Sequence, residues 1–409
     1  MGLNLKNTRD NVFWTICIMG LFAILSSTMS KNPVLNQFAS SLETPAGFWM
    51  GFVGSASTIP GILISLPAAS LSDILGRKKF LLLSAIVFAS APFLYLLITV
   101  WWQLILVRFY HGFATAIFVP VAEASIAELF PTKLGERISL FSSATYVGRV
   151  IAPLLGGYIL LVSNTDFHML YLAVGVAGVT AFIMALPLLA ERRKQTNNIP
   201  RQKAKETLKL MFRGWANVAR NRGVLIVSFV QACQYYTYGA VEYFMGGYLP
   251  EVVHLDFLST GIITGSLIAI PIFLKPYMGR ISDKIGRRTP IAVGLVVSGL
   301  PLLAIPFVAN FPTLLLLSVV YGLGFASVTA STPALVSELV PKEFVGGGMG
   351  FLDMIMDVGQ TIGPIISGLI LATNLQYAGL FPSLTFVLLF SCVIFVLSGV
   401  AKTDSGKNA

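Results

Sequence analysis

The chain contains a repeat of itself at a shift of 210 residues. Residues 71–78 read LSDILGRK, and residues 281–288 read ISDKIGRR. Residues 128–131 (ELFP) and 338–341 (ELVP) match at the same shift. Separate matches at one offset of about half the chain length indicate two homologous halves that follow one another in the same orientation.

The composition excludes an ordinary water-soluble fold. With 55% hydrophobic and only 11% charged residues, the chain has too little polar surface to cover itself in water. Apolar stretches long enough to cross ~30 Å of hydrocarbon lie near residues 12–40, 46–70, 79–100, 104–129, 139–163, 169–190, 221–249, 257–276, 289–309, 312–340, 344–373 and 377–400. Their lengths favour helices over the strands of a membrane barrel. The sequence therefore predicts an all-α integral membrane protein with 12 transmembrane helices in two pseudo-symmetric six-helix bundles.

The predicted domains are residues 1–190, a basic linker of residues 191–222, and residues 223–409. In the linker, apolar residues share one helical face, which favours a helix on the membrane surface, although a simple basic tether explains the charge equally well. If both termini are cytoplasmic, the outer loops contain no Lys or Arg, and the inner loops hold the basic residues. This asymmetry predicts a multi-pass protein of the plasma (inner) membrane with cytoplasmic termini. It also explains the net charge of +10 without nucleic-acid binding.

Cysteine and metal-ligand patterns predict no cofactor. Cys17, Cys233 and Cys392 lie in apolar stretches without CxxC spacing, so we expect neither a disulfide nor a metal site. No nucleophile and base pattern or phosphate-binding loop indicates an enzyme. We expect a monomer whose partners are a small-molecule substrate, protons and the lipid bilayer.

The two repeated loops resemble the doubled loop signature of the major facilitator superfamily, and this resemblance extends over essentially the whole chain. It implies two six-helix halves around a central site and a carrier that alternates its access. In that family the loop residues and the acidic ends of the fourth and tenth helices latch one half against the other. The corresponding residues here are Asp73, Gly76, Arg77, Glu128, Asp283, Gly286, Arg287 and Glu338.

The loops also have a physical logic. Gly76 and Gly286 permit a tight turn between two helices, and the aspartates can accept hydrogen bonds from the arginines. A simpler interpretation is that the positive charge only holds the loops inside. Ala69 stands where the second copy has Gly279, so we expect the added methyl to loosen the helix approach in the first copy.

Two helices resemble those of drug:proton antiporters. Arg108 and its neighbours follow the fourth-helix pattern of proton-linked members, and residues 148–157 (GRVIAPLLGG) resemble the fifth-helix antiporter signature. The resemblance implies export. Bending and close packing are expected from Gly148, Pro153, Gly156 and Gly157. Arg149 departs from the signature, because an apolar residue is usual there.

Charges inside apolar stretches mark candidate working residues, because each costs about 2.5 to 3.5 kcal/mol at a helix centre. They are Lys31, Arg108, Glu123, Arg149, Glu242, Asp353 and Asp357. Glu123 and Arg149 flank the predicted cytoplasmic turn between the fourth and fifth helices at similar depth, so an ion pair is expected there. Asp353 and Asp357 lie one turn apart on one face, where mutual repulsion favours a bound proton. We expect Glu123, Asp353 and Asp357 to include the proton-coupling group, while hydrogen bonding between helices is the alternative for any single one.

Polar groups form one stripe on the seventh predicted helix. The residues are Gln231, Gln234, Tyr235, Tyr238 and Glu242, which recur at helical spacing. With Arg108, Arg149 and Lys31 they are the candidate cavity residues. Aromatic rings beside a carboxylate suit amphipathic or cationic organic compounds. The alternative is that these groups only hydrogen-bond neighbouring helices.

Three functions remain open. The first is a proton-coupled exporter of small amphipathic organic compounds, and the second is a flippase or exporter of a lipid or glycolipid. The third is a membrane sensor that does not transport. The complete loop signatures and the intramembrane acids favour transport over a sensor.

Overall fold

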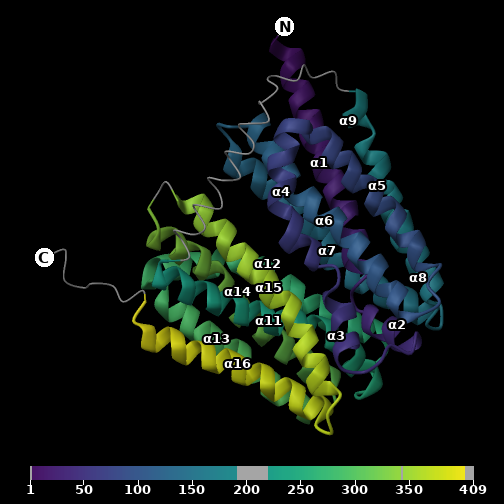
Figure 1. Ribbon diagram of the computed structural model, residues 1–409, viewed down its shortest axis with the longest axis vertical. Coiled ribbons are helices and arrows are strands. Elements are labelled where there is room, and N and C mark those ends of the chain that lie inside the picture. Colours follow the sequence, from purple (N-terminus) through teal and green to yellow (C-terminus); the bar gives the residue numbers. More distant parts are fainter. Residues whose placement is uncertain (1, 191–219, 342–343, 401–409) are drawn as a thin grey trace, which may run out of the picture. The chain divides into compact units, whose positions relative to one another are not determined.

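A computed structural model describes residues 2–190, 220–341 and 344–400, and in this part every regular element is a helix (Figure 1). The predicted linker helix falls on residues 191–219, outside the described residues. The first half comprises α1 (Gly2–Met29), α2 (Leu35–Ser41), α3 (Phe48–Ser55), α4 (Ile59–Leu75), α5 (Arg77–Tyr95), α6 (Trp101–Leu129), α7 (Leu134–Val162), α8 (Phe167–Ala185) and α9 (Pro187–Ala190). The second comprises α11 (Arg222–Glu251), α12 (Phe257–Ile285), α13 (Arg288–Ala304), η1 (Ile305–Phe307), α14 (Phe311–Leu339), α15 (Val345–Leu371) and α16 (Gln376–Ser398).

The helices confirm the all-α membrane fold. Within the described residues, 10 helices are long and apolar enough to cross a membrane, and the bent pair of α3 and the start of α4 raises this number to 11. The remaining predicted span forms α11, whose 30 residues extend about 45 Å at 1.5 Å per residue. This helix is long enough to span, but its polar stripe lowers its hydropathy.

Two of the predicted spans are not continuous helices. The stretch 12–40 breaks after Met29, and α2 begins only at Leu35, because Pro33 cannot continue a helix from the preceding turn. The stretch 46–70 divides into α3 and α4, which meet at an angle of 41°. Pro60 lies in the first turn of α4, where its missing N–H is tolerated.

The chain divides into two compact units. The first comprises Met1–Thr44, Ala56–Lys209 and Asp256–Gly261, and the second comprises Pro45–Ser55, Leu210–Leu255 and Ile262–Ala409, so far as these residues are described. Each half thus lends one short segment to the other unit: α3 packs on α15, and the start of α12 packs on α7. The predicted division at residues 190 and 223 remains a prediction.

The first unit has an aromatic core between α1, α5, α6 and α7. Phe88, Phe118 and Phe141 are fully or almost fully buried, and successive ring centroids lie 6.0 and 5.9 Å apart. At these separations the rings attract one another in edge and tilted arrangements. The core therefore fixes how these helices are rotated about their axes.

Glycines bring α11 and α15 together in the second unit. A Cβ atom on Gly363 would lie 2.1 Å from the carbonyl oxygen of Tyr236, and one on Gly359 would lie 2.3 Å from that of Ala232. Small residues at helix interfaces allow backbones to approach this closely in membranes. The rotation of α11, and with it the direction of its polar stripe, is thereby fixed.

Asn221 starts α11 with hydrogen bonds in two directions. Its side-chain oxygen accepts from the backbone N–H groups of Gly223 and Val224, at 2.9 and 3.3 Å. Its amide nitrogen donates to the carbonyl oxygen of Leu339 at 3.0 Å. The start of α11 and the end of α14 therefore lie at the same end of the second unit.

Candidate functional site

The two glutamines of the α11 stripe hydrogen-bond neighbouring helices. Gln231 accepts from the Thr332 hydroxyl of α14 at 2.5 Å, and Gln234 donates to the Ser298 hydroxyl of α13 at 3.3 Å. Both glutamine side chains are buried. The structure thus places these two amides in helix-to-helix contacts, and their role in a cavity remains a prediction.

The other members of the stripe form an aromatic cluster with an acid. Tyr238 and Tyr235 pack against Phe325 of α14, with ring centroids 4.8 and 5.2 Å away. The Tyr238 hydroxyl donates to the carboxylate of Glu242 at 3.4 Å, and Glu242 is only 7% exposed. A buried carboxylate bound to one member of an aromatic cluster is a suitable environment for an organic cation. Phe325 was not foreseen, since it lies in an unbroken apolar stretch.

The acidic pair on α15 has a basic neighbour that the sequence analysis missed. Asp357 is half-buried and Asp353 is more exposed. The charge of Lys275 acts on Asp353, and the charge of Asp353 acts on Asp357. Lys275 precedes Pro276 within the apolar stretch of α12, so its charge in an otherwise apolar run was the available signal.

Arg108 lies in a buried polar cluster of the first unit. It is 2% exposed and donates to the Ser57 hydroxyl at 2.6 Å. The Tyr95 hydroxyl lies within hydrogen-bonding reach of Arg108 and 3.4 Å from the His111 ring. His111 belongs with Arg108 to the predicted fourth-helix pattern on α6. Ser57 and Tyr95 were not predicted, because they approach Arg108 from the α3–α4 turn and from α5.

Three other charged residues that the sequence predicts for the site do not belong to the polar cluster around Arg108. Glu123 of α6 and Arg149 of α7 are both exposed, and their ion pair remains a prediction. Lys31 was expected inside a helix, and that expectation is wrong. It lies half-buried in the turn between α1 and α2, because the first predicted span ends early at Met29.

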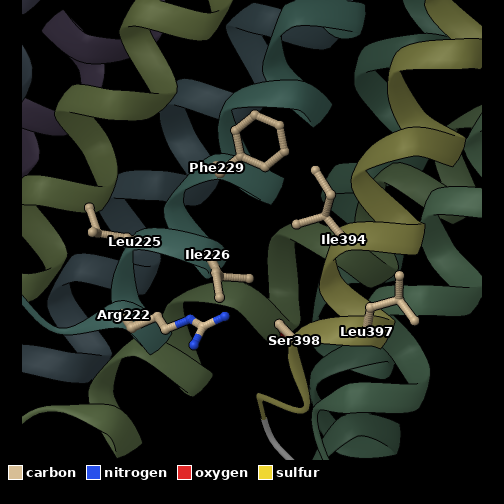
Figure 2. A pocket seen from close by; sticks show the side chains of 7 residues that line it. All are labelled: Arg222, Leu225, Ile226, Phe229, Ile394, Leu397 and Ser398. Carbon is tan, nitrogen blue, oxygen red and sulfur yellow. The ribbon is translucent and has the colours of Figure 1, made fainter.

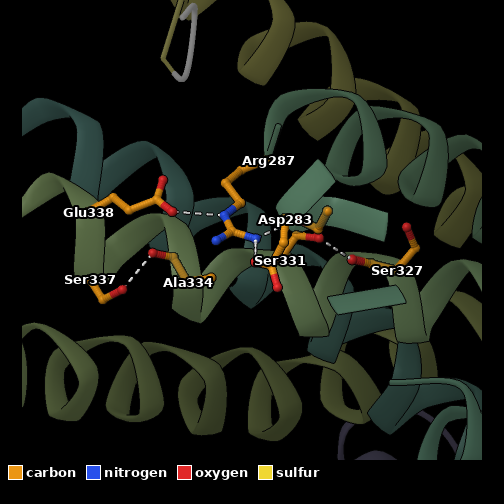
Figure 3. Close-up of polar contacts among 8 residues, drawn as sticks. Asp283, Arg287, Ser327, Ser331, Ala334, Ser337 and Glu338 are labelled. Carbon is orange, nitrogen blue, oxygen red and sulfur yellow. Dashed lines mark hydrogen bonds and ion pairs between the residues drawn. The ribbon is translucent and has the colours of Figure 1, made fainter. Parts of the chain in front are cut away.

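The loop between α12 and α13 brings together the predicted members of the second signature. Gly286 has a φ of +84°, which glycine adopts without steric cost. The Arg287 guanidinium donates to Glu338 at 2.9 Å and contacts Asp283 and the Ser282 hydroxyl (Figure 3). These charge-assisted contacts tie the end of α14 to the loop.

The loop between α4 and α5 repeats this geometry in the first unit. Gly76 has a φ of +102°, and Arg77 donates to Glu128 and to the Ser72 hydroxyl at 3.2 and 3.1 Å. The side chain of Asp73 lies outside the described residues. The expected effect of Ala69 stays a prediction, because its side chain lies outside the described residues. In the second copy a Cβ atom on Gly279 would meet no described atom within 4 Å.

The antiporter-like segment of α7 packs through its glycines. A Cβ atom on Gly148 would lie 2.3 Å from the carbonyl oxygen of Leu21 in α1, and one on Gly157 would lie 2.3 Å from that of Phe257. Gly156 faces Asn32, and Pro153 is buried within the helix. The predicted close packing of this helix therefore has specific partners.

A buried aromatic and acid cluster and paired loop signatures, all carried on membrane-spanning helices, define the class as membrane carriers. The family model described as "Major Facilitator Superfamily" matches residues 12–273 and 227–409. The chain belongs to the major facilitator superfamily.

Relatives of similar length carry names of exporters. The chain is 26% identical to the multi-drug resistance efflux pump PmrA homolog of Lactococcus lactis, with 89% of each chain covered. It is 24% identical to the quinolone resistance protein NorA of Staphylococcus aureus, with 88% of this chain and 90% of the relative covered.

Solved structures share the fold. A bacterial homolog of the human lysosomal transporter Spinster superposes with a TM-score of 0.80 at 14% identity, covering 96% of this chain and 97% of that one. The nucleoside transporter NupG superposes with a TM-score of 0.73 at 14% identity, covering 95% and 97%. At these identities the likeness concerns the fold.

Proposed function

We propose that this protein is a proton-coupled secondary active exporter of small amphipathic organic compounds, with a preference for cations. The observation that carries the proposal is the buried Glu242 carboxylate beside Tyr235, Tyr238 and Phe325. An acid in a transmembrane helix is costly unless it serves a partner or a substrate. The relatives named as multidrug efflux pumps support export over import.

The acids on α15 and α6 support coupling to protons. Asp353 and Asp357 lie one turn apart, so the pair is more stable with one proton bound than with two negative charges. Glu123 is the third candidate. Proton release from such a group on one side and uptake on the other would drive export by alternating access.

The orientation follows from the loops. The described basic residues of the α4–α5 and α12–α13 connections would face the cytoplasm under the positive-inside rule. Both termini would then lie on the cytoplasmic side of the plasma membrane. Separately, we propose that the carrier works as a monomer.

The function is tested in everted membrane vesicles with amphipaths of equal size and different charge. We expect the cationic compound to dissipate an imposed pH gradient most strongly, because Glu242 offers a negative charge to it. Glu242→Gln should remove the preference for the cation over the neutral compound. Tyr235→Ala should weaken binding of all aromatic compounds by about 0.5–1.5 kcal/mol, the value of a lost ring pair.

Glu136→Gln is the matched control, because Glu136 is an exposed acid in the first turn of α7, 3.6 Å from Lys133. If the anionic compound is transported most strongly, and Arg108→Ala or Arg149→Ala abolishes that transport, the site binds anions and the proposed cation preference is wrong. Gradient dissipation by lipids alone would favour a flippase.

The loop clusters are proposed to act as a conformational latch, and Asp283→Asn or Asp73→Asn tests this role. If the cluster stabilises one state of the cycle, its loss shifts the population and lowers turnover, while equilibrium binding changes little. Unfolding temperature should also change little, because exposed ion pairs contribute little to stability. Turnover in proteoliposomes and binding to purified protein are compared. Equal losses of affinity and turnover would contradict the latch.

A further inference from the structure

A groove on the surface of the second unit runs between the start of α11 and the end of α16. It has a volume of about 600 Å³ and is lined by Arg222, Leu225, Ile226, Phe229, Ile394, Leu397 and Ser398 (Figure 2). This volume lies within the ~300–1,000 Å³ range of small-ligand sites. Among the described residues, Arg222 is the one charged residue that lines it.

The walls of the groove are apolar and exposed. Leu225, Phe229 and Leu397 are 43%, 39% and 79% exposed. From Arg222 to Phe229 the groove follows α11 for about 10 Å at 1.5 Å per residue. Because these helices cross a membrane, such walls are stable against hydrocarbon, and an acyl chain is the hydrocarbon available there.

The charged end of the groove is positive. Arg222 is exposed, and no ion pair between it and a carboxylate is found in the described part of the chain. The last turn of α16 would repel an anion through its free carbonyl groups, but Arg288 donates to the Val396 carbonyl at 2.8 Å. Arg222 is therefore the one charged side chain among the described residues that line the groove, and it lies at the end of an apolar channel.

We propose that this groove binds one anionic phospholipid, with its phosphate at Arg222 and one acyl chain along Leu225, Phe229 and Leu397. Asn221 fixes the first turn of α11 by its hydrogen bonds, so Arg222 has a defined place at the end of the helix. Basic residues at the membrane surface attract anionic headgroups. The other candidate occupant, the linker of residues 191–219, is itself basic and would place like charges against Arg222.

The test compares two lipids that differ only in headgroup charge. Purified full-length protein is titrated with phosphatidylglycerol or phosphatidylcholine of identical chains, and the first bound lipid is counted by native mass spectrometry. We expect about fivefold tighter binding of phosphatidylglycerol, the contribution of one basic residue near a membrane surface. Arg222→Gln should remove most of this preference, whereas Lys284→Gln, an exposed cation at the same end of the unit, should leave it unchanged.

Three further results decide the outcome. Ile226→Trp, which fills the groove, should weaken binding of both lipids. Equal binding of the two lipids to the wild type, or full competition by soluble glycerol phosphate, would overturn the proposal. Efficient disulfide formation between Ile394→Cys and Trp215→Cys in membranes, with the three native cysteines replaced, would show that the linker occupies the groove instead.

Discussion

Asp357→Asn is expected to lower proton-coupled export at least about tenfold, which corresponds to ~1.4 kcal/mol. Asp357 is half-buried on α15, one turn from Asp353. The positive charge of Lys275 on α12 interacts with the charge of Asp353. Of the two acids Asp357 is the more buried, so the proton that relieves their mutual repulsion is expected on Asp357. Asparagine keeps the shape of this side chain but cannot exchange the proton. The measurement is substrate-induced loss of a pH gradient in everted vesicles.

Two companion variants sharpen this result. Asp353→Asn should reduce coupling less than Asp357→Asn, and Asp357→Glu should retain part of it, because a carboxyl group remains. Glu136→Gln serves again as the control for loss of an acid. If single Asn or Gln changes at Glu123, Asp353 and Asp357 all leave the signal intact, none of these acids is the coupling group.

Gly363→Val is expected to lower the unfolding temperature of the purified protein by about 5 °C or more. The Cβ atom would lie 2.1 Å from the Tyr236 carbonyl oxygen, so α11 and α15 must separate or the backbone must deform. Overpacking of this kind typically costs about 1–3 kcal/mol, and each kcal/mol shifts the melting temperature by ~2–4 °C for domains of this size. A branched residue at Gly359, next to Ala232, should behave in the same way.

Gly299→Ala is the matched control within the same unit. Its Cβ atom would lie 3.6 Å from Thr385, an ordinary van der Waals distance, and alanine favours the helix. Its unfolding temperature should therefore stay within about 2 °C of the wild type. A Gly363→Val protein as stable as this control would show that α11 and α15 do not pack as tightly as described.

The repeat in the sequence allowed much of the fold to be predicted. Arg77 contacts Glu128 and Arg287 contacts Glu338, each pair 51 residues apart. The two loop glycines both have positive φ. These contacts are local to one helical hairpin and its neighbour, so a motif of fixed spacing is sufficient to foresee them.

Contacts between distant helices were harder to predict. Hydropathy averaged over a whole span did not reveal where the first two spans break, although polar residues precede Pro33 (residues 30–32, SKN) and Pro60 (residues 55–58, SAST). Phe325 joins the α11 stripe as one of many apolar side chains of α14, and Ser57 approaches Arg108 from the turn between α3 and α4. Which residues meet across helices depends on helix rotation, and that rotation is set by packing of small residues such as Gly363.

Because the Asn221 side chain hydrogen-bonds both α11 and α14, it limits where the polypeptide can be cut or lengthened. A fusion partner inserted before Asn221 would leave its bonds to Gly223, Val224 and Leu339 in place. An insertion one or two residues later would separate the cap from α11 and release the end of α14. If the carrier were expressed as two polypeptides, the second should therefore begin at or before Asn221.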